Sequence, residues 1–567
     1  MNQNRQCKQC GKPFAIDATD VEFLKKLSPF EDEKLTITPS SLCPSCKMTT
    51  LMAWRNERSL HKLKCALCKN DIISVYSEDK KFNVLCRDCF WSDKWDATHQ
   101  GIGFDFKSTF FKQFAQLLKT TKLLSLFSTN NENCEFVNQE TDDNNCYLCV
   151  GGNTNDECYY CTYAAFCRDC IDCLGITNSE NLHDCTFCIS CYGSQGLFNC
   201  NVCRDCYFCE DCIGCENCFG SINLRYKKYF FFNEELPKDE YITKIREYLD
   251  SEKGSEKAKK EFAKHRLNFI FKYANRIFCE GKCTGDILIR CKNVENVYYS
   301  NASENAKNAF LLNKINDVMD GLAVGRGELV YYSGSSPGLF STAFSSSCFK
   351  LRNSYYCYMC YNSNNLFGCI GLNHKEYCIL NKQYSKKDYE EILPRIIEQM
   401  KEPKEWGEFF PISLSPFAYN ESFANEFFRL DKNEAKSCGV NWSESASREF
   451  KGEEYHIKDL NNYNIKYNKE AEQEIKKCLD GIVKCAITKR PFKITARELA
   501  QYIERNIQLP TKHPDQRNSE RLKLLNKMDL YHRKCMNGSC TNEFETTYAP
   551  DRPEKVYCEE CYQKEVI

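Results

Sequence analysis

Between Cys200 and Cys218 a cysteine recurs at every third position, and this spacing restricts the fold more than any other feature of the chain. A period of three fits neither a 3.6-residue helix nor the alternation of a half-buried strand. The surrounding segment, from about residue 131, places short clusters of cysteine and aromatic residues between Asn, Asp, Gly and Ser every 10 to 13 residues. We therefore expect a β-solenoid, with short strands stacked into coils and polar residues at the corners.

The end of this segment recurs 148 residues later, which indicates an internal duplication. The stretch from Phe219 to Tyr241 matches the stretch from Phe367 to Tyr389 at nine positions without a gap. Aromatic residues in residues 275–383 also recur about every 11 to 13 residues. We expect these residues to form a second solenoid.

The two copies can be compared cysteine by cysteine. Cys203 and Cys206 of the first copy align with Leu351 and Ser354 of the second. A metal ligand cannot be replaced by Leu, whereas a free cysteine that packs as a small apolar residue can. We interpret most of these cysteines as interior packing residues. A metal cluster or thiol relay confined to the first copy, or a set of disulfides, remains an alternative.

Pairs of cysteines with metal-ligand spacing lie outside the duplicated region. Two CxxC pairs that share one ion supply the four sulfurs of a tetrahedral zinc site. The first set has 32 residues between its pairs and the second has 17. We predict two zinc sites in residues 1–97, and their ligands are Cys7, Cys10, Cys43 and Cys46 for the first, and Cys65, Cys68, Cys86 and Cys89 for the second.

The first of these sets resembles a known family. The pattern CKQCGKPF at Cys7–Phe14, the segment FLKK at Phe23–Lys26 and the pattern CPSCK at Cys43–Lys47 are similar to the probable zinc-ribbon domain family. Lys47 stands where that family usually has Arg. The resemblance covers about 45 residues, and the wider arrangement is similar to large uncharacterised bacterial proteins that combine such ribbons with cysteine-rich repeats. It implies an architecture and no particular activity.

The C-terminal residues 471–567 repeat the N-terminal module in a modified form. Cys485 and His513 correspond to Cys7 and Cys43, but Thr488 and Gln516 replace two ligands, so we expect this first ribbon to have lost its zinc. The second ribbon keeps four cysteines, with four residues inside its first pair. Its predicted ligands are Cys535, Cys540, Cys558 and Cys561. The sequence thus predicts about three structural Zn²⁺ ions.

Basic residues lie at matching positions beside the ribbons of both modules. Such strips are typical of contacts with phosphate, although an ordinary solvated helix has the same composition. The predicted nucleic-acid-binding residues are Arg55, Arg58, Lys62 and Lys64 in the first module, and Arg517, Arg521, Lys523, Lys527, Arg533 and Lys534 in the second.

Composition limits the other classes. The chain has 41 Cys and a formal charge of −1, so affinity for nucleic acid has to come from local patches. It opens MNQNRQCKQC without an apolar segment, and no run of 18 apolar residues follows. We expect a cytoplasmic protein without a membrane span, with thiols that are free or bound to metal. The oligomeric state is not predicted.

These features together predict a mainly β protein with two tandem, duplicated solenoids between two ribbon modules. The expected divisions are 1–97 (double ribbon), 98–130 (connecting helix), 131–235 (first solenoid), 236–274 (helical linker), 275–383 (second solenoid), 384–402 (helix), 403–470 (extended arm) and 471–567 (C-terminal ribbons). We find no Ser/His/Asp set, P-loop or HExxH motif. The preferred function is a non-enzymatic zinc scaffold that binds RNA, DNA or a ribonucleoprotein surface. A protein-binding assembly scaffold, and a thiol or metal redox or storage protein, are the alternatives.

Overall fold

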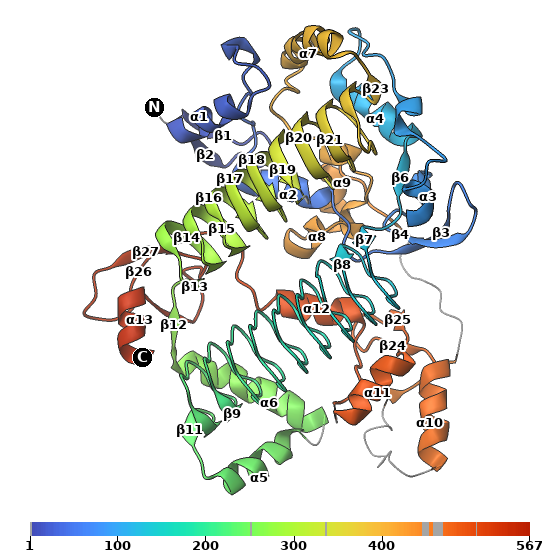
Figure 1. Cartoon of the computed structure of the whole chain (residues 1–567). Helices are drawn as coiled ribbons and strands as arrows, with labels where there is room; N and C mark the ends of the chain where they lie inside the picture. Colours follow the sequence, from blue (N-terminus) through green and yellow to red (C-terminus); the bar gives the residue numbers. More distant parts are fainter. Residues whose placement is uncertain are drawn as a thin grey trace.

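Two stacks of parallel coils form the centre of the molecule in the computed structural model of the chain (Figure 1). The structure describes residues 3–249, 252–334, 337–444, 453–457, 469–505 and 507–566. We call residues 128–231 the first stack and residues 276–379 the second stack. No helix in these described ranges is long and apolar enough to cross a membrane.

The first stack is built from coils of twelve residues. Every third residue makes a parallel bridge to the residue twelve positions later, from Glu132 with Asn144 to Ile213 with Arg225. One residue in each triplet, such as Asn145 or Phe208, has φ near +50°, so the chain turns after every three residues. The remaining residue of each triplet points inward. This geometry explains the period of three: four triplets make one coil.

The second stack keeps the register of twelve but has longer strands. Its coils form an 11-stranded sheet in sequence order, and pairings such as Lys292 with Glu304 and Asn316 with Glu328 repeat the same step. Its strands are β13 (Arg276–Ile277), β14 (Glu280–Ile289), β15 (Lys292–Asn301), β16 (Glu304–Phe310), β17 (Asn313–Leu322), β18 (Gly325–Gly334), β19 (Leu339–Ala343), β20 (Phe349–Tyr355), β21 (Tyr361–Phe367), β22 (Glu376–Ile379) and β23 (Lys382–Gln383).

The interior of both stacks is made of the residues that the duplication aligns. Cys203 and Cys206 are 1% and 0% exposed, and their counterparts Leu351 and Ser354 are buried equally. Thiols such as Cys209 lie between the carbonyl oxygens of Tyr207 and Cys218, at 3.4 and 3.6 Å. The predicted interior position of these cysteines is confirmed, and the interpretation that they pack as small apolar residues remains a prediction.

The same cap closes both stacks. In the first, β9 (Glu216–Phe219) and β10 (Lys228–Phe231) are followed by the antiparallel β11 (Glu234–Glu235), and in the second β22 is followed by β23. Asn233 bonds both backbone groups of Ile222, at 2.7 and 3.0 Å, and Asn381 does the same to Ile370, at 2.8 Å for each. A buried amide thus satisfies the backbone where the ladder ends.

Helices and short strands link or cover the stacks. The N-terminal module contains β1 (Gln3–Gln6), β2 (Pro13–Ile16), α1 (Ala18–Leu27), α2 (Pro44–Ala53), β3 (His61–Lys64), β4 (Asp71–Ser74), β5 (Asn83–Leu85) and α3 (Arg87–Phe90). The connecting elements are α4 (Phe110–Thr120), β6 (Lys122–Leu124), β7 (Ser128–Thr129), β8 (Glu140–Thr141), α5 (Lys238–Leu249), α6 (Glu252–His265), β12 (Ile270–Lys272), α7 (Lys386–Lys401), α8 (Ala424–Phe427) and α9 (Lys432–Ser437). The C-terminal elements are α10 (Lys469–Asp480), β24 (Val483–Lys484), β25 (Pro491–Phe492), α11 (Ala496–Glu504), α12 (Pro514–Leu522), β26 (Tyr531–Lys534), β27 (Glu543–Thr546), β28 (Lys555–Tyr557) and α13 (Glu559–Val566).

The ribbon modules contact the stacks at equivalent places. Strand β5 pairs in parallel with β6, which leads into the first stack, and β28 pairs in parallel with β12, which leads into the second. Lys47 on α2 forms an ion pair with Asp320 of the second stack, and Arg517 on α12 forms one with Asp172 of the first. Asp172 and Asp320 are themselves 148 residues apart. Each module therefore joins the two stacks, and the two halves of the chain repeat one arrangement.

An aromatic core lies between the N-terminal module, the second stack and residues 403–444. The Phe410 ring stacks on Phe114 of α4 with centroids 4.2 Å apart, and the Phe417 ring stacks on Tyr76 at 5.4 Å. Phe423 contacts Tyr163 of the first stack and Phe310 of the second. This part of the predicted arm contains α8 and α9, and its residues 445–452 and 458–468 lie outside the described residues.

Candidate metal centres and the cations beside them

Three groups of four cysteines bring their sulfur atoms together. Within each group all Sγ atoms lie within 4.8 Å of one another, and the groups are the three that the spacing predicts: Cys7, Cys10, Cys43 and Cys46; Cys65, Cys68, Cys86 and Cys89; Cys535, Cys540, Cys558 and Cys561. Four sulfurs about 2.3 Å from one zinc ion are about 3.8 Å from one another. One Sγ–Sγ distance in each group fits this value: Cys10 to Cys43 is 3.7 Å, Cys68 to Cys86 is 3.8 Å and Cys540 to Cys558 is 3.8 Å.

Each group is positioned by a hairpin and by the start of a helix. The first pair of cysteines lies in the turn of a two-stranded hairpin: β1–β2, β3–β4 or β26–β27. The second pair begins a helix, and Cys43 and Cys86 are the N-caps of α2 and α3. Gly11 and Lys69 follow the first pair with φ of +71° and +67°, which closes the turn around the sulfurs. The three groups are consistent with zinc-ribbon-like modules.

Backbone N–H groups point at the same sulfur in all three groups. The N–H of Cys43 donates to Cys7, that of Cys86 to Cys65 and that of Cys558 to Cys535, each at 3.3 Å. Burial raises the pKa of Cys65, but these backbone donors outweigh it and lower the pKa to about 6. The side chain of Cys46 acts as a donor that lowers the pKa of Cys43 to about 5. The thiolate, the form that binds metal, is therefore favoured at Cys43 and Cys65, whereas hydrogen bonds with these or neighbouring thiols raise the pKa of Cys46 and Cys89.

Interior thiols of the stacks are not grouped as the ribbon cysteines are. Among the described residues, no interior set of stack cysteines has its sulfurs as close together as the three ribbon groups. Their pKa values are shifted in both directions: burial raises the pKa of Cys209 and Cys369 well above the ordinary thiol value, whereas at Cys161 and Cys360 hydrogen bonds from neighbouring thiols outweigh burial and lower the pKa. Geometry, and not the charge of the thiols, therefore separates the stack cysteines from the ribbon groups.

A fourth hairpin, β24–β25, keeps the ribbon shape although only one of its four ligand positions, Cys485, is still cysteine. Cys485 is fully buried and accepts an N–H from Thr488 at 3.4 Å, while Lys489 repeats the positive φ of Gly11 and Lys69. His513 takes the place of Cys43 as N-cap, and its Nδ1 accepts the N–H of Asp515 at 3.1 Å. Hydrogen bonds thus hold the helix start that the metal would otherwise fix.

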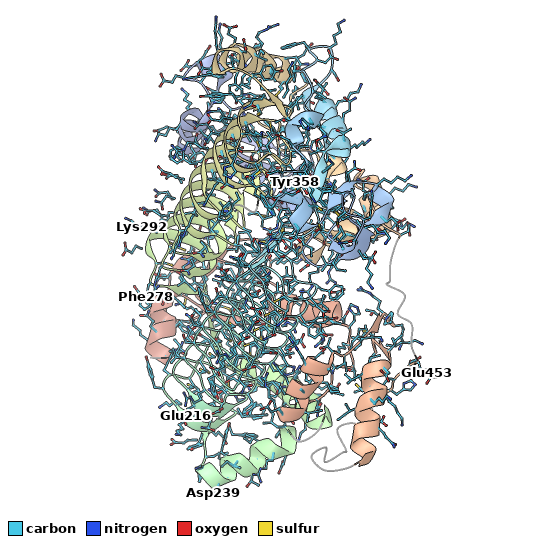
Figure 2. All side chains as sticks on the ribbon, turned by 45° about the vertical axis from the view of Figure 1, so that its right-hand side comes forward. Glu216, Asp239, Phe278, Lys292, Tyr358 and Glu453 are labelled. Carbon is cyan, nitrogen blue, oxygen red and sulfur yellow. The ribbon has the colours of Figure 1, made fainter. Side chains whose placement is uncertain are left out.

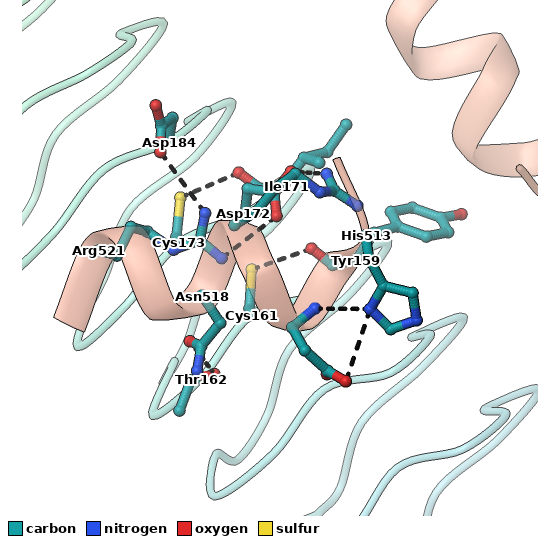
Figure 3. Close-up of polar contacts among 12 residues, drawn as sticks. Tyr159, Cys161, Thr162, Ile171, Asp172, Cys173, Asp184, His513, Asn518 and Arg521 are labelled. Carbon is teal, nitrogen blue, oxygen red and sulfur yellow. Dashed lines mark hydrogen bonds and ion pairs between the residues drawn. The ribbon is translucent and has the colours of Figure 1, made fainter. Parts of the chain in front are cut away.

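Four of the ten predicted nucleic-acid-binding residues lie inside the protein, which corrects that part of the prediction. Arg517 and Arg521 project from α12 into the first stack and pair with Asp172, and Arg521 also reaches Asp184 (Figure 3). Arg55 is 4% exposed and pairs with Glu57. The Arg58 side chain is 10% exposed, donates to the Thr162 hydroxyl at 2.9 Å and forms an ion pair with Asp515 at 3.6 Å. These guanidinium groups neutralise buried carboxylates or join modules, and Arg58 also lines a cleft between the modules.

The other six cations lie nearer the solvent, but three have partners. Lys64 pairs with Asp71 at 2.8 Å and Lys534 with Glu543 at 3.2 Å, whereas Arg533 donates to the carbonyls of Tyr548 and Ala549. Lys62, Lys523 and Lys527 are exposed. The matching strips read from the sequence therefore leave few free charges beside the ribbons.

Asp172 and Asp184 are functional residues of the module contact that sequence reasoning missed. Asp172 is fully buried, and burial raises its pKa even though Arg517 and Arg521 act against that rise. Lys259 and Arg521 hold the pKa of Asp184 below its usual range despite burial. Their spacing of twelve residues, one coil, was the signal available in the sequence, because it places both on one column of the stack.

No protein-family model matches the chain, and no curated protein matches it.

Proposed function

We propose that the protein is a non-enzymatic zinc-binding scaffold that binds nucleic acid, alone or in a ribonucleoprotein. The observation that carries the zinc part is the set of three four-cysteine groups with tetrahedral spacing. Sites with four protein thiolates leave no position open for water or substrate, which is typical of structural zinc. Iron also accepts four thiolates, so the identity of the metal is part of the proposal.

We interpret the two stacks as duplicated β-solenoids that set the distance between the ribbons. Zinc in these modules would fix strands β5 and β28, which pair with the strands leading into the first and second stacks. The divisions proposed from the sequence remain our working description of the domains. In this interpretation the ribbons hold the stacks together, and the stacks present the binding surface.

Metal analysis tests the zinc part. Protein purified without added metal is measured by inductively coupled plasma mass spectrometry, and we expect three zinc ions per chain without iron. Iron, or many more than three metal ions per chain, would favour a thiol or metal redox or storage protein instead. Binding of labelled RNA and DNA oligonucleotides with strong salt dependence tests the nucleic-acid part.

A protein-binding assembly scaffold is the second candidate, and a cleft favours it. The cleft has a volume of about 570 Å³ and lies between the N-terminal module, the first stack, residues 420–430 and the C-terminal module. Tyr147, Tyr160 and Phe492 line it together with Arg429 and Arg490. Aromatic and Arg side chains are enriched at protein interfaces. Crosslinking that captures one defined protein at this cleft, with no nucleic-acid binding, would favour this candidate.

A further inference from the structure

One strip on the outside of the second stack carries positive charge and no carboxylate. A column is a set of positions that are twelve residues apart and therefore lie above one another in the stack. The strip consists of two adjoining columns, one that begins at Ile277 and one that begins at Phe278. Its cations are Arg290, Lys314, Arg326 and Lys350. The other positions, through residues 373–374, are Ile289, Asn301, Ala302, Asn313, Gly325, Pro337, Gly338, Phe349, Tyr361, Asn362, Asn373 and His374. Tyr361 is buried against Phe90 and Trp91 of the N-terminal module, so the exposed part of the strip ends before it. We call this surface the basic strip.

The four cations of the basic strip are exposed and have no carboxylate partner among the described residues. Neighbouring columns of the same stack behave differently, because Lys292 pairs with Glu304 at 3.3 Å and Lys282 with Glu295 at 3.9 Å. Lys292 projects from the outer side of the second stack in Figure 2. The charge of the basic strip is therefore available to an external anion.

Aromatic rings accompany these cations. Phe278 is 80% exposed at the start of the strip, and Phe349 is 36% exposed beside Lys350, whose Nζ lies 5.2 Å from the ring centre. Phe340, on the adjoining column, is 37% exposed with the Arg352 guanidinium 4.9 Å from its ring. Exposed rings next to unpaired cations are the features on which unpaired bases stack.

A hollow lies at the first coils of the strip. It has a volume of about 400 Å³, and Phe278, Arg290 and Ala302 line it from the strip. Glu280, Lys292 and Glu304 line it from the adjoining column, where Lys292 and Glu304 form the ion pair described above. The surface is thus concave where the exposed ring and the first cation meet.

The cations are spaced by the coil repeat. Adjacent parallel strands are about 4.8 Å apart, so Lys314 and Arg326 are separated by one such step along the stack axis. Arg290 and Lys350 lie two steps beyond them on either side, and the row is about 24 Å long. A row of this length matches a site of several nucleotides rather than one isolated phosphate.

We propose that the basic strip binds single-stranded nucleic acid laid along the axis of the second stack. The phosphates contact Arg290, Lys314, Arg326 and Lys350, and unpaired bases stack on Phe278, Phe340 and Phe349. A duplex offers the same phosphates but keeps its bases in the helix, so the exposed rings favour a single strand. This inference rests on the nucleic-acid part of the proposed function and moves the site from the ribbons to the stack.

Fluorescence anisotropy of the full-length, zinc-loaded protein tests the site. The probes are labelled U12 RNA and dT12 DNA, with a 12-base-pair RNA duplex for comparison, at NaCl concentrations from 50 to 200 mM. The test variant is R290Q/K314Q/R326Q/K350Q. We expect at least a tenfold loss of affinity for the single strands and a salt slope that is shallower by up to about 3, since four phosphate contacts are removed at roughly 0.7 each.

A second quadruple variant controls for net charge. K26Q/K244Q/K386Q/K387Q removes four exposed lysines that pair with a glutamate one helical turn away, outside the stacks. It should bind as the unmodified protein does. F340A/F349A should lose at least fivefold in affinity for single strands and keep the salt slope, because stacking contributes without releasing counterions. Thermal unfolding checks that each variant is folded.

Each outcome decides a different claim. If the unmodified protein binds neither single strand, the nucleic-acid part of the proposed function is wrong and this inference falls with it. If it binds but the strip variant matches the lysine control, the function stands and the site is wrong. Equal binding of duplex with no effect of F340A/F349A would overturn the stacking role. Binding of polyglutamate in preference to U12 and dT12 would indicate an acidic protein partner. A difference between U12 and dT12 identifies the nucleic acid.

Discussion

The two stacks share one register and one cap but differ in what fills them and in what they present. The inward positions Cys206, Cys209, Cys212 and Cys215 of one coil in the first stack are all cysteine, whereas the matching positions of the second are Ser354, Cys357, Cys360 and Ser363. On the outside, the positions equivalent to the basic strip's cations are Asp142, Phe166, Asn178 and Val202. The volume and spacing of the inward residues therefore determine the coil geometry. The outward residues are not constrained in this way, so they can differ in charge and function between the two stacks.

The same contrast applies to how the stacks hold the modules. Asp172 and Asp320 are equivalent positions, and each receives a cation from the helix of a ribbon. Asp172 faces two arginines, while Asp320 faces Lys47, whose Nζ also lies 5.8 Å from the ring centre of Tyr331. The two stacks thus make the same contact with a ribbon module through different cations. The two contacts can be compared by substituting Asp172 and Asp320.

The largest expected effect separates ribbon thiols from stack thiols. Cys65→Ser removes one ligand of a four-cysteine group, and structural zinc contributes about 10 kcal/mol or more to small modules of this kind. We expect the variant to hold two zinc ions instead of three and to lose protection against proteolysis in residues 61–90. Metal analysis and limited proteolysis measure both.

Cys206→Ser is the matched control for this prediction. The second stack has Ser354 at the equivalent position, where its hydroxyl donates to the Arg352 carbonyl at 2.8 Å and accepts the N–H of Leu366 at 3.2 Å. The control should keep three zinc ions and its protease resistance. A loss of metal from it would show that stack thiols are ligands and would contradict the packing interpretation.

Breaking the equivalent buried ion pairs is expected to have the next largest effect. Asp172→Asn leaves Arg517 and Arg521 buried without a full counter-charge, and removal of one partner from a buried pair typically costs about 3–5 kcal/mol. Asp320→Asn should cost less, because only Lys47 loses its partner and aromatic faces remain beside it. Urea unfolding of both variants measures the order.

Asp71→Asn provides the surface reference for that comparison. Asp71 is 86% exposed on its side chain and pairs with Lys64 at 2.8 Å, and surface pairs contribute little to stability because water and salt screen both charges. The reference should unfold at nearly the same urea concentration as the unmodified protein. If Asp172→Asn behaves like Asp71→Asn, the buried network does not hold the C-terminal module to the first stack.

Much of this organisation could be predicted from the sequence, and the reasons are physical. The CxxC spacing identified the four-cysteine groups because each CxxC pair can place two sulfurs on one ion, and two such pairs complete a tetrahedral site. The match between Phe219–Tyr241 and Phe367–Tyr389 identified the duplication, and the exchange of Cys203 for Leu351 excluded a shared ligand. These signals are local or repeat at a fixed offset.

Contacts between distant segments could not be predicted in the same way. Arg517 and Arg521 are basic residues beside a ribbon, which is typical of a phosphate contact, and nothing in their neighbourhood shows that Asp172 lies opposite. The sequence indicated a repeat of 10 to 13 residues but did not give the exact coil length of twelve. Once it is known, Arg290, Lys314, Arg326 and Lys350 fall on one column, whereas a step of 10 to 13 residues scatters them.

Interior packing offers a smaller test of the comparison between stacks. Cys203→Leu introduces the leucine that the second stack has at the equivalent position, Leu351, into a coil whose interior is already filled by cysteines. Such overpacking typically lowers the free energy of unfolding by about 1–3 kcal/mol. The double variant Cys203→Leu/Cys206→Ser reproduces the Leu–Ser neighbours of the second stack, and we expect it to recover part of that loss. Thermal unfolding measures both variants. A double variant less stable than Cys203→Leu would show that volumes do not compensate within a coil.

The smallest expected effect is an opposite response of the two module contacts to pH. Glu498 of α11 accepts the Tyr160 hydroxyl of the first stack at 2.7 Å, and burial raises its pKa to about 7 even though Arg517 opposes the rise. A raised carboxyl pKa means that the folded state binds a proton that the unfolded state has released. Stability from this group is therefore greatest below pH 4.5 and is lost as the pH rises to about 7.

Asp17 of the N-terminal module behaves in the reverse sense. Burial raises its pKa, but Lys307 of the second stack, 2.7 Å away, outweighs burial and holds the pKa well below its usual range. Stability from Asp17 is present above the unfolded pKa of 3.8 and is lost as the pH falls below it. Melting curves between pH 3 and 8 should show Glu498→Gln removing part of the loss between pH 5 and 7, and Asp17→Asn removing part of the loss below pH 4. Identical profiles for the two variants would mean that these two contacts respond to pH in the same way, and that the difference between the halves lies in packing and outer charge alone.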